Sequence, residues 1–307
     1  MAVPVGTAGE PPLREGPSVD PGKPFIPEEL TPLFHTASYR ELTEAQRLRY
    51  NQLQALYFNE QIMVFETVLG RPILEALLRA PSPLPARLAE GVRQFRDEEQ
   101  RHTEMFRQLN RNAAPYLYAD CDFQFVQVPA AWRAATAWAV GHPARFPLFL
   151  WLMLLQEERS IYYSRSYLRS RRSLDPSFVA VHRAHMADEV GHVRWDEELL
   201  DVLWRRARPW LRRLNAKLFA WMLEELFSTP RRAQLRVVDA LCSELPELAE
   251  RREEMRRQLL ALSRDESYRA TLYSREIVPR TFARFDAAPE LRSLAICGYR
   301  PLPEAVA

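Results

Sequence analysis

Apolar residues recur every three or four positions through most of the chain, which is the spacing that places them on one face of an α-helix. Thr43 followed by Gln46 resembles a capping box, and Asp175 followed by Pro176 is an N-cap residue with proline at the first helical position. The pattern and its breaks predict four long helices, over residues 43–80 with a kink at Pro72, and over 85–111, 149–169 and 175–206.

The segments outside these helices divide the rest of the chain. Residues 112–129 lose the helical period and predict a long connection packed on the bundle, and residues 130–141 and most of 208–285 are again helical in pattern. Residues 1–32 are rich in proline and glycine and predict a disordered arm. We therefore expect one helical domain over residues 33–290, followed by a tail over 291–307.

Composition narrows the class of protein. Only 9 glycines in 307 residues argue against a turn-rich all-β fold, and a net charge of +2 gives no reason to expect a nucleic-acid partner. The three cysteines lie far apart, no signal peptide is recognisable, and the longest apolar run, 146–155, is too short to span a membrane. These features predict a cytoplasmic protein without a membrane segment.

Ionisable residues interrupt the apolar stripe of the last long helix. His185, Glu189 and His192 stand at i, i+4 and i+7, so they share one helix face with Phe178 before them and Leu199 after them. Burying an unpaired carboxylate beside two imidazoles is costly, and a bound metal ion would remove that cost. The stripe therefore predicts metal ligands.

The same arrangement recurs in the first half of the chain. Glu99 and His102 form a second Glu-x-x-His motif in the middle of an apolar stripe. The helix before each motif should contribute one further glutamate. The pattern alone leaves two candidates in each helix, Glu60 or Glu66 in the first and Glu157 or Glu158 in the third.

Hairpin geometry favours one glutamate in the first helix, because facing residues in an antiparallel pair lie equally far from the turn. Glu66 and Glu99 lie about equally far from a turn near Ser82, whereas Glu60 would be off by more than a helical turn. In the second half, Glu158 and Glu189 lie about equally far from a turn near Ser173. The slightly more apolar neighbours of Glu158 favour it over Glu157.

Two lone-glutamate helices and two Glu-x-x-His helices are the construction of ferritin-like di-iron and di-manganese proteins. We therefore expect an all-α, ferritin-like four-helix bundle with a long crossover connection and additional C-terminal helices. Its centre would hold two iron ions, with manganese as the alternative metal. Acidic residues that could orient the histidines are Glu98, Asp188 and Asp196. His182 lies one turn before His185, and its position fits a surface group as well as a group that orients a ligand.

With its extra histidine before the last Glu-x-x-His motif, the sequence resembles the p-aminobenzoate N-oxygenase family of non-haem di-iron enzymes. The resemblance covers about residues 40–205. It implies that the ligands are Glu66, Glu99, His102, Glu158, His185, Glu189 and His192. It also implies an oxidoreductase that uses O2 to oxidise a small organic substrate, with N-oxygenation of an arylamine in natural-product biosynthesis as the expected reaction.

Neither a glycine-rich dinucleotide fingerprint nor a cysteine set for an iron–sulfur cluster is present in the sequence, so we expect an external electron donor. A homodimer is compatible with this interpretation. Two other functions stay open: a different di-iron or Mn/Fe redox enzyme of the hydroxylase or desaturase type, and a ferritin-like iron-binding protein without an organic substrate.

Overall fold

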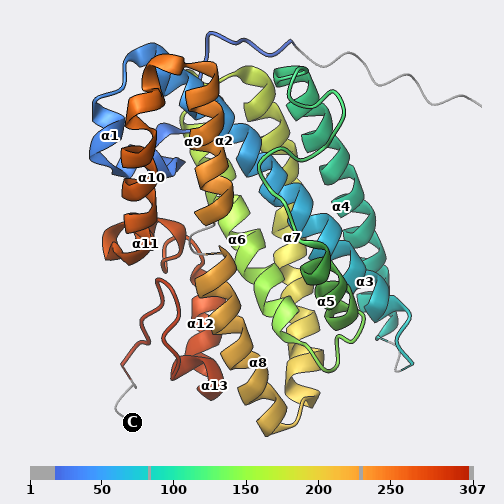
Figure 1. The fold of residues 1–307 in the computed structure, drawn as a ribbon. Helices are drawn as coiled ribbons and strands as arrows, with labels where there is room; N and C mark the ends of the chain where they lie inside the picture. Colours follow the sequence, from blue (N-terminus) through green and yellow to red (C-terminus); the bar gives the residue numbers. More distant parts are fainter. Residues whose placement is uncertain (1–17, 82–83, 228–230, 304–307) are drawn as a thin grey trace, which may run out of the picture.

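Every regular element in the described part of the chain is helical (Figure 1). The computed structural model describes residues 18–81, 84–227 and 231–303. Its centre is a bundle of four long helices, and the first of them continues through a π-helical turn, η3 (Glu66–Gly70), into α3 (Arg71–Leu78). The four are α2 (Glu44–Phe65), α4 (Ala86–Ala113), α6 (Leu148–Arg169) and α7 (Pro176–Arg206). The predicted all-α bundle is confirmed.

Two antiparallel hairpins form this bundle, α2–α3 with α4 and α6 with α7. The two hairpins meet mainly through α4 and α7. A long crossover joins them and carries α5 (Ala130–Val140), so residues 122–128 belong to the connection rather than to a strand. This crossover allows the two Glu-x-x-His helices, α4 and α7, to lie side by side.

Side-chain caps fix where two of the long helices begin. The Thr43 hydroxyl accepts a hydrogen bond from the Gln46 amide, and the Gln46 side chain accepts one from the Thr43 amide, which completes the expected capping box. The Asp175 carboxylate accepts the amides of Ser177 and Phe178 at the start of α7. The register of the ligand-bearing helices is thus set by local sequence.

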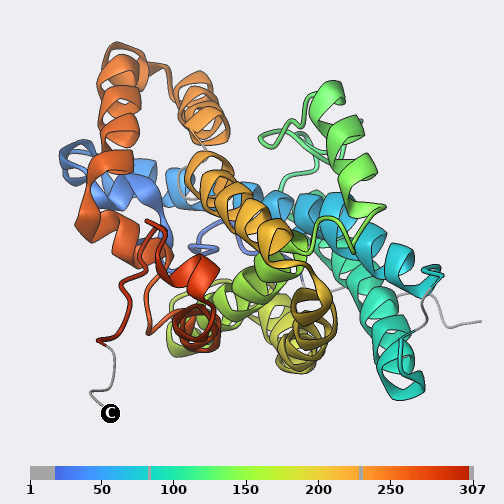
Figure 2. The same cartoon turned by 90° about the horizontal axis from the view of Figure 1, so that it is seen from below.

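A helical extension follows the bundle and packs against α2 and α6. Its α9 lies on α2, while α8 and α12 lie on α6, as the end view shows (Figure 2). The extension comprises α8 (Pro209–Met222), the π-helical turn η4 (Leu223–Phe227), α9 (Arg231–Glu244), η5 (Pro246–Arg251), α10 (Arg252–Ala261), η6 (Leu262–Arg264), α11 (Glu266–Leu272), α12 (Pro279–Ala287) and α13 (Pro289–Arg292).

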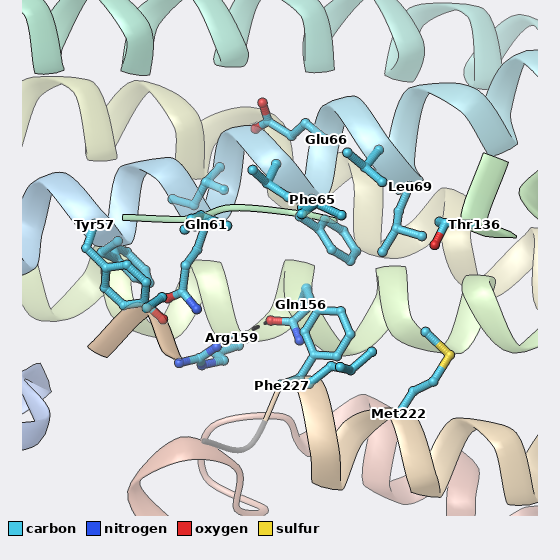
Figure 3. Close-up of a pocket in the computed structure, with 18 of the residues that line it drawn as sticks. Tyr57, Gln61, Phe65, Glu66, Leu69, Thr136, Gln156, Arg159, Met222 and Phe227 are labelled. Carbon is cyan, nitrogen blue, oxygen red and sulfur yellow. Dashed lines mark hydrogen bonds between the residues drawn. The ribbon is translucent and has the colours of Figure 1, made fainter. Parts of the chain in front are cut away.

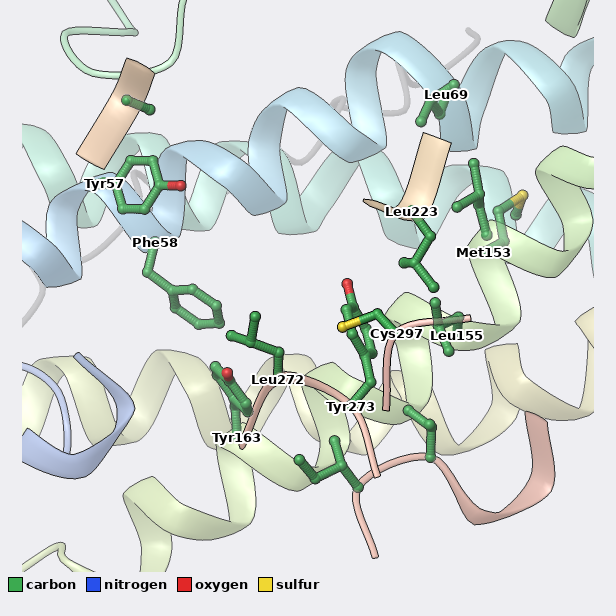
Figure 4. Packing of buried hydrophobic residues seen from close by; sticks show 14 of the residues in the cluster. Tyr57, Phe58, Leu69, Met153, Leu155, Tyr163, Leu223, Leu272, Tyr273 and Cys297 are labelled. Atoms are coloured by element: carbon green, nitrogen blue, oxygen red, sulfur yellow. The ribbon is translucent and has the colours of Figure 1, made fainter. Parts of the chain in front are cut away.

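The extension shares one apolar core with the bundle. Figure 4 shows Leu272, Tyr273 and Cys297 of the extension near Phe58 of α2 and Tyr163 of α6. The segment expected as a tail also contributes to this core, through residues such as Leu291, Ile296 and Tyr299, each no more than 6% exposed. The extension is therefore a fixed wall of the molecule.

The arm expected over residues 1–32 is ordered in its second half; residues 1–17 lie outside the described part. Phe25 is buried and stacks on Phe178 of α7, with ring centroids 4.3 Å apart. The side-chain oxygen of Asn51 accepts the amides of Phe25 and Ile26, which ties the arm to α2. The short elements η1 (Glu28–Leu30), η2 (Pro32–His35) and α1 (Ala37–Arg40) follow.

None of the helices in the described ranges combines the length and the apolar character needed to cross a membrane.

Candidate metal centre

Six of the seven predicted ligands come together in the interior of the bundle. Each lies in the middle of a helical segment, and none is more than 2% exposed. η3 contributes Glu66 at its first residue, and the other five come from the two Glu-x-x-His helices: Glu99 and His102 from α4, and His185, Glu189 and His192 from α7.

One group of donor atoms lies between α4 and α7. His192 Nδ1 is 3.1 Å from Glu189 Oε2 and 3.4 Å from Glu99 Oε1. His102 Nδ1 is 3.4 Å from Glu189 Oε1 and 3.6 Å from Glu99 Oε1. One ligand atom from each of these four residues can be chosen so that all lie within 4.8 Å of one another.

A second group is built from Glu66, His102 and His185. His185 Nε2 is 3.5 Å from Glu66 Oε1, and His102 Nδ1 is 3.8 Å from the same oxygen. The two groups share His102, and Glu189 links them because its Oε1 is 2.7 Å from His185 Nε2. Two adjoining donor groups are the arrangement that a dinuclear centre requires.

Four of the atoms that face one another in these groups make no hydrogen bond among the described residues, although Glu189 Oε1 forms an ion pair with His185. They are Glu66 Oε1, Glu99 Oε1, His102 Nδ1 and Glu189 Oε1. A buried polar atom without a hydrogen bond is unfavourable, and four of them within two adjoining donor groups mark a place where cations belong. Carboxylate and imidazole donors suit iron or manganese, so the residues present fit a dinuclear centre of either metal.

The protein's own charges also show the need for a cation. Burial and the neighbouring Glu99 carboxylate raise the pKa of Glu66 to about 7. Burial lowers the pKa of His185, but the Glu189 and Glu66 carboxylates together outweigh burial and raise this pKa to about 10. Without a metal, protons on these groups neutralise the carboxylates, and a metal ion would replace them.

The structure gives Glu158, which the sequence favoured, and Glu157 different surroundings. The Glu158 carboxylate points away from the centre and accepts the amides of Arg280 (2.9 Å) and Thr281 (2.7 Å), together with the Thr281 hydroxyl (2.7 Å). Glu157 instead lies beside Glu189 and lines the cavity, and burial together with the Glu189 charge raises its pKa well above the ordinary value. Glu157 is therefore the α6 carboxylate beside the other ligands.

In the first helix, Glu66 lies among the clustered carboxylates and imidazoles, whereas Glu60 binds the crossover. The buried Glu60 carboxylate accepts the Tyr118 hydroxyl at 2.7 Å, and it also accepts three consecutive amides, those of Gln124, Phe125 and Val126, at 2.7–2.8 Å. All four donors lie in the crossover. Glu60 thus holds the crossover against α2, about 1.7 helical turns before Glu66.

The expected orienting acids contact the histidines crosswise. Glu98 of α4 has Oε2 3.0 Å from Nε2 of His192 on α7, and Asp188 of α7 has Oδ2 3.1 Å from Nε2 of His102 on α4. Each contact leaves Nδ1 of the same ring facing the carboxylate cluster, so the acid fixes both the ring orientation and the nitrogen offered to a metal. Arg101 lies within 3.6 Å of both acids.

Three further polar residues lie close to the ligands. The Thr103 hydroxyl donates to Glu66 Oε2 at 2.7 Å, and Ser160 Oγ is 3.1 Å from His185 Nδ1. Neither residue stands out in the sequence pattern. Asp196 is fully buried, and burial raises its pKa well above the ordinary value, although the His192 charge opposes this.

His182 is buried rather than a surface group. It stacks on Tyr167 at a ring-centroid distance of 3.8 Å and also packs against the rings of Phe58 and Phe106. Burial lowers the pKa of its imidazole well below the ordinary value, so this ring is neutral. It packs behind His185, one helical turn away.

The π-helical turn η3 lies where the first helix passes the centre. Glu66 is its first residue and Gly70 its last, and such turns are frequent at functional sites. A Cβ atom at position 70 would lie 3.0 Å from Glu99 Oε2. The absence of a side chain at Gly70 therefore leaves room for the Glu99 carboxylate.

A cavity of about 600 Å³ adjoins the ligand cluster. Its walls include Glu66, Glu99, Glu157, His185 and Glu189, and its remaining lining is largely apolar. The lining comes from α2, η3, α5, α6 and the extension, as the close-up shows for η3, α6 and η4 (Figure 3). Its size suits a small organic molecule placed against the metal centre.

Comparison with known proteins agrees with this geometry. The family described as P-aminobenzoate N-oxygenase AurF matches residues 14–271, which is most of the chain. No curated protein matches the sequence. The matched region contains all the donor residues described above, the crosswise acids and most of the cavity wall. The chain therefore belongs to the p-aminobenzoate N-oxygenase (AurF) family of di-iron oxidoreductases.

Proposed function

We propose that this protein is a di-iron N-oxygenase that uses O2 to oxidise the amino nitrogen of a small arylamine. The observation that carries the proposal is a buried cluster of unpartnered carboxylate and imidazole atoms that opens directly into a 600 Å³ cavity. An iron store needs no such apolar chamber, so the cavity favours an enzyme with an organic substrate.

The proposed ligands are the six clustered residues and Glu157 in place of Glu158. They are Glu66, Glu99, His102, Glu157, His185, Glu189 and His192. Two ferrous ions bound there would supply the reducing equivalents and the coordination positions that O2 activation needs. We favour iron over manganese because the family is one of di-iron enzymes.

The protein's own residues orient the ligands and line the cavity beside them. Glu98 and Asp188 hold the rings of His192 and His102, and Ser160 Oγ lies against Nδ1 of His185. The largely apolar lining of the cavity would favour an aromatic substrate over water beside the metals. Converting an arylamine and O2 into an arylhydroxylamine and water consumes two electrons and two protons, which we assign to an external donor and to solvent.

The test is turnover with defined components. The protein is loaded with iron, reduced chemically, and mixed with 4-aminobenzoate and ¹⁸O-labelled O2, and products are followed by mass spectrometry. We expect ¹⁸O on the nitrogen for the wild type and for Asp97→Ala, an exposed residue of α4 paired with Arg96. Glu99→Ala should give no product. Full iron loading with O2 consumption but no oxidised organic product from a panel of arylamines would contradict the proposal.

A further inference from the structure

The crossover helix α5 is exposed although its sequence is almost entirely apolar. Apart from Arg133 and Thr136 it contains only alanine, tryptophan and valine, yet Val140 is the only one of its residues that is buried. Figure 2 shows α5 (green) projecting from the edge of the bundle. An exposed helix without a polar outer face marks a surface that another molecule covers.

A second exposed apolar stripe runs along α8. Trp210, Leu214 and Trp221 share one face of this helix and are 58%, 48% and 47% exposed. The ring of Trp221 stacks on that of Trp132 from α5, with the ring centroids 6.0 Å apart, and Trp132 is itself 43% exposed. These four residues, which we call the tryptophan face, join the crossover to the extension.

Every charged residue of α5 and α8 is basic. α5 contains Arg133, and α8 contains Arg212, Arg213 and Lys217, whereas neither helix has an aspartate or a glutamate. Arg212 pairs with Glu290, but the other three are exposed and make no ion pair among the described residues. The whole chain has a net charge of only +2, so the charge around the tryptophan face favours an acidic partner.

The tryptophan face lies beside the metal centre. Trp132 and Trp221 line the same cavity as Glu66 and His185, and α5 packs on η3, whose first residue is Glu66. Because both tryptophans are also partly exposed, they lie where this cavity meets the surface. The exposed acid Glu225 belongs to the same lining and is outnumbered by the open basic residues. An electron donor on this face would be separated from the metals by the cavity alone.

The charges and the position distinguish such a donor from two other occupants. A second copy of the chain docked face to face would bring Arg213 and Lys217 against their own counterparts, with no acid on either helix to pair with them. An anionic membrane would suit the charges and the tryptophans, but it supplies no electrons to the centre behind them. Electron-transfer complexes have small interfaces, which two neighbouring helices can provide.

We propose that the tryptophan face and its open basic residues form the docking site of an acidic electron-transfer protein that reduces the metal centre. Two molecules of a one-electron donor, such as a [2Fe–2S] ferredoxin, would each lose one electron, and the two ferric ions would become ferrous. This docking site rests on the proposed function only for the need of an external donor, because reduction can be measured without an organic substrate.

The experiment mixes the oxidised, iron-loaded protein with a reduced donor in the absence of O2 and follows oxidation of the donor by stopped-flow absorbance. The donors are two acidic proteins, a plant-type [2Fe–2S] ferredoxin and a flavodoxin. We expect the wild type to be reduced at a rate that falls as the salt concentration rises. Arg213→Glu combined with Lys217→Glu should slow reduction at least about tenfold at low salt. Trp210→Ala should slow it at every salt concentration, because an apolar contact is lost.

Arg165→Glu combined with Arg183→Glu is the matched control, since it reverses two exposed charges of α6 and α7 near the end of the bundle opposite α8. This control should keep the wild-type rate, and all variants should keep their iron and their reduction by dithionite. Reduction by dithionite but by neither donor would overturn the proposal, as would a rate insensitive to salt and to the paired substitution at Arg213 and Lys217.

Two further measurements address the other occupants. Binding to phosphatidylglycerol vesicles that Trp210→Ala abolishes would assign the face to a membrane, and a dimer that Trp210→Ala dissociates would assign it to a second copy. Either result would overturn the proposal. Failure of both donors alongside N-oxidation with a chemical reductant would refute this docking site and leave the proposed function intact.

Discussion

Adjacent glutamates on α6 should respond to the same substitution in opposite ways. Glu158→Ala removes a carboxylate that accepts two amides and a hydroxyl, and the two amides belong to the first turn of α12. Val278, the residue before α12, offers no side-chain cap, so Glu158 caps this helix from α6. Its removal leaves buried donors unpaired while the metal ligands stay in place.

The size of this effect follows from the bonds lost. A helix cap contributes about 1–2 kcal/mol, and a hydrogen bond to a charged group about 1.5–3 kcal/mol, but the three bonds to Glu158 share one acceptor and do not add fully. We therefore expect Glu158→Ala to lower the free energy of unfolding of the metal-free protein by ~3 kcal/mol. Metal content should stay at two ions per chain.

Glu157→Ala should do the reverse. Burial and the charge of Glu189 already raise the pKa of Glu157, so removing this carboxyl relieves repulsion in the metal-free protein and should not destabilise it. Metal content should fall, because a donor is lost. Urea denaturation of the metal-free proteins and elemental analysis after reconstitution check both halves. Metal loss in Glu158→Ala together with full metal in Glu157→Ala would refute the assignment.

Three other outcomes follow from the same site. Glu60→Ala should lower the free energy of unfolding by about 2–4 kcal/mol, because the hydrogen bonds to the crossover are lost, but it should keep its metal. Glu66→Ala should lose metal. Denaturation and elemental analysis distinguish the two variants. Glu98→Ala should weaken metal affinity roughly 10–100-fold in a chelator competition, since His192 loses its orienting partner, and an unchanged affinity would contradict this. Burial and Glu99 raise the pKa of Glu66 in the folded, metal-free protein to about 7. The folded protein therefore keeps this proton to a higher pH than the unfolded chain does. Its free energy of unfolding should fall as the pH rises from about 4.5 to 7. Denaturation curves across this range should show a smaller loss for Glu66→Gln, and an identical pH dependence would disprove the assignment.

Much of the fold followed from the sequence because its determinants are local. The capping box at Thr43 and the N-cap at Asp175 fix helix starts, and counting residues from the turn selected Glu66, which lies in the cluster. Glu98 and Asp188 were predicted to orient histidines, but the sequence did not show which ring each acid would contact. That choice depends on how α4 and α7 pack against each other.

What the sequence could not supply depends on distant partners. Neighbouring helix positions are only about 100° apart, so the pattern favoured Glu158 over Glu157 only through slightly more apolar neighbours. The deciding contact is the start of α12, more than a hundred residues further along the chain. Likewise, the arm beyond residue 17 is ordered because Asn51 of α2 binds it, and no periodicity in the arm itself signals that contact.

The crosswise acids tie the two hairpins into one functional unit. Each Glu-x-x-His helix carries the carboxylate that aims the imidazole of the other, so neither hairpin contains a complete set of ligands and supports. A fragment or transplanted hairpin would present its histidine without a defined tautomer. A change at Glu98 or Asp188 on one hairpin would retune the metal held by the opposite one. Changes at these two positions of α4 and α7 are therefore coupled across the two hairpins.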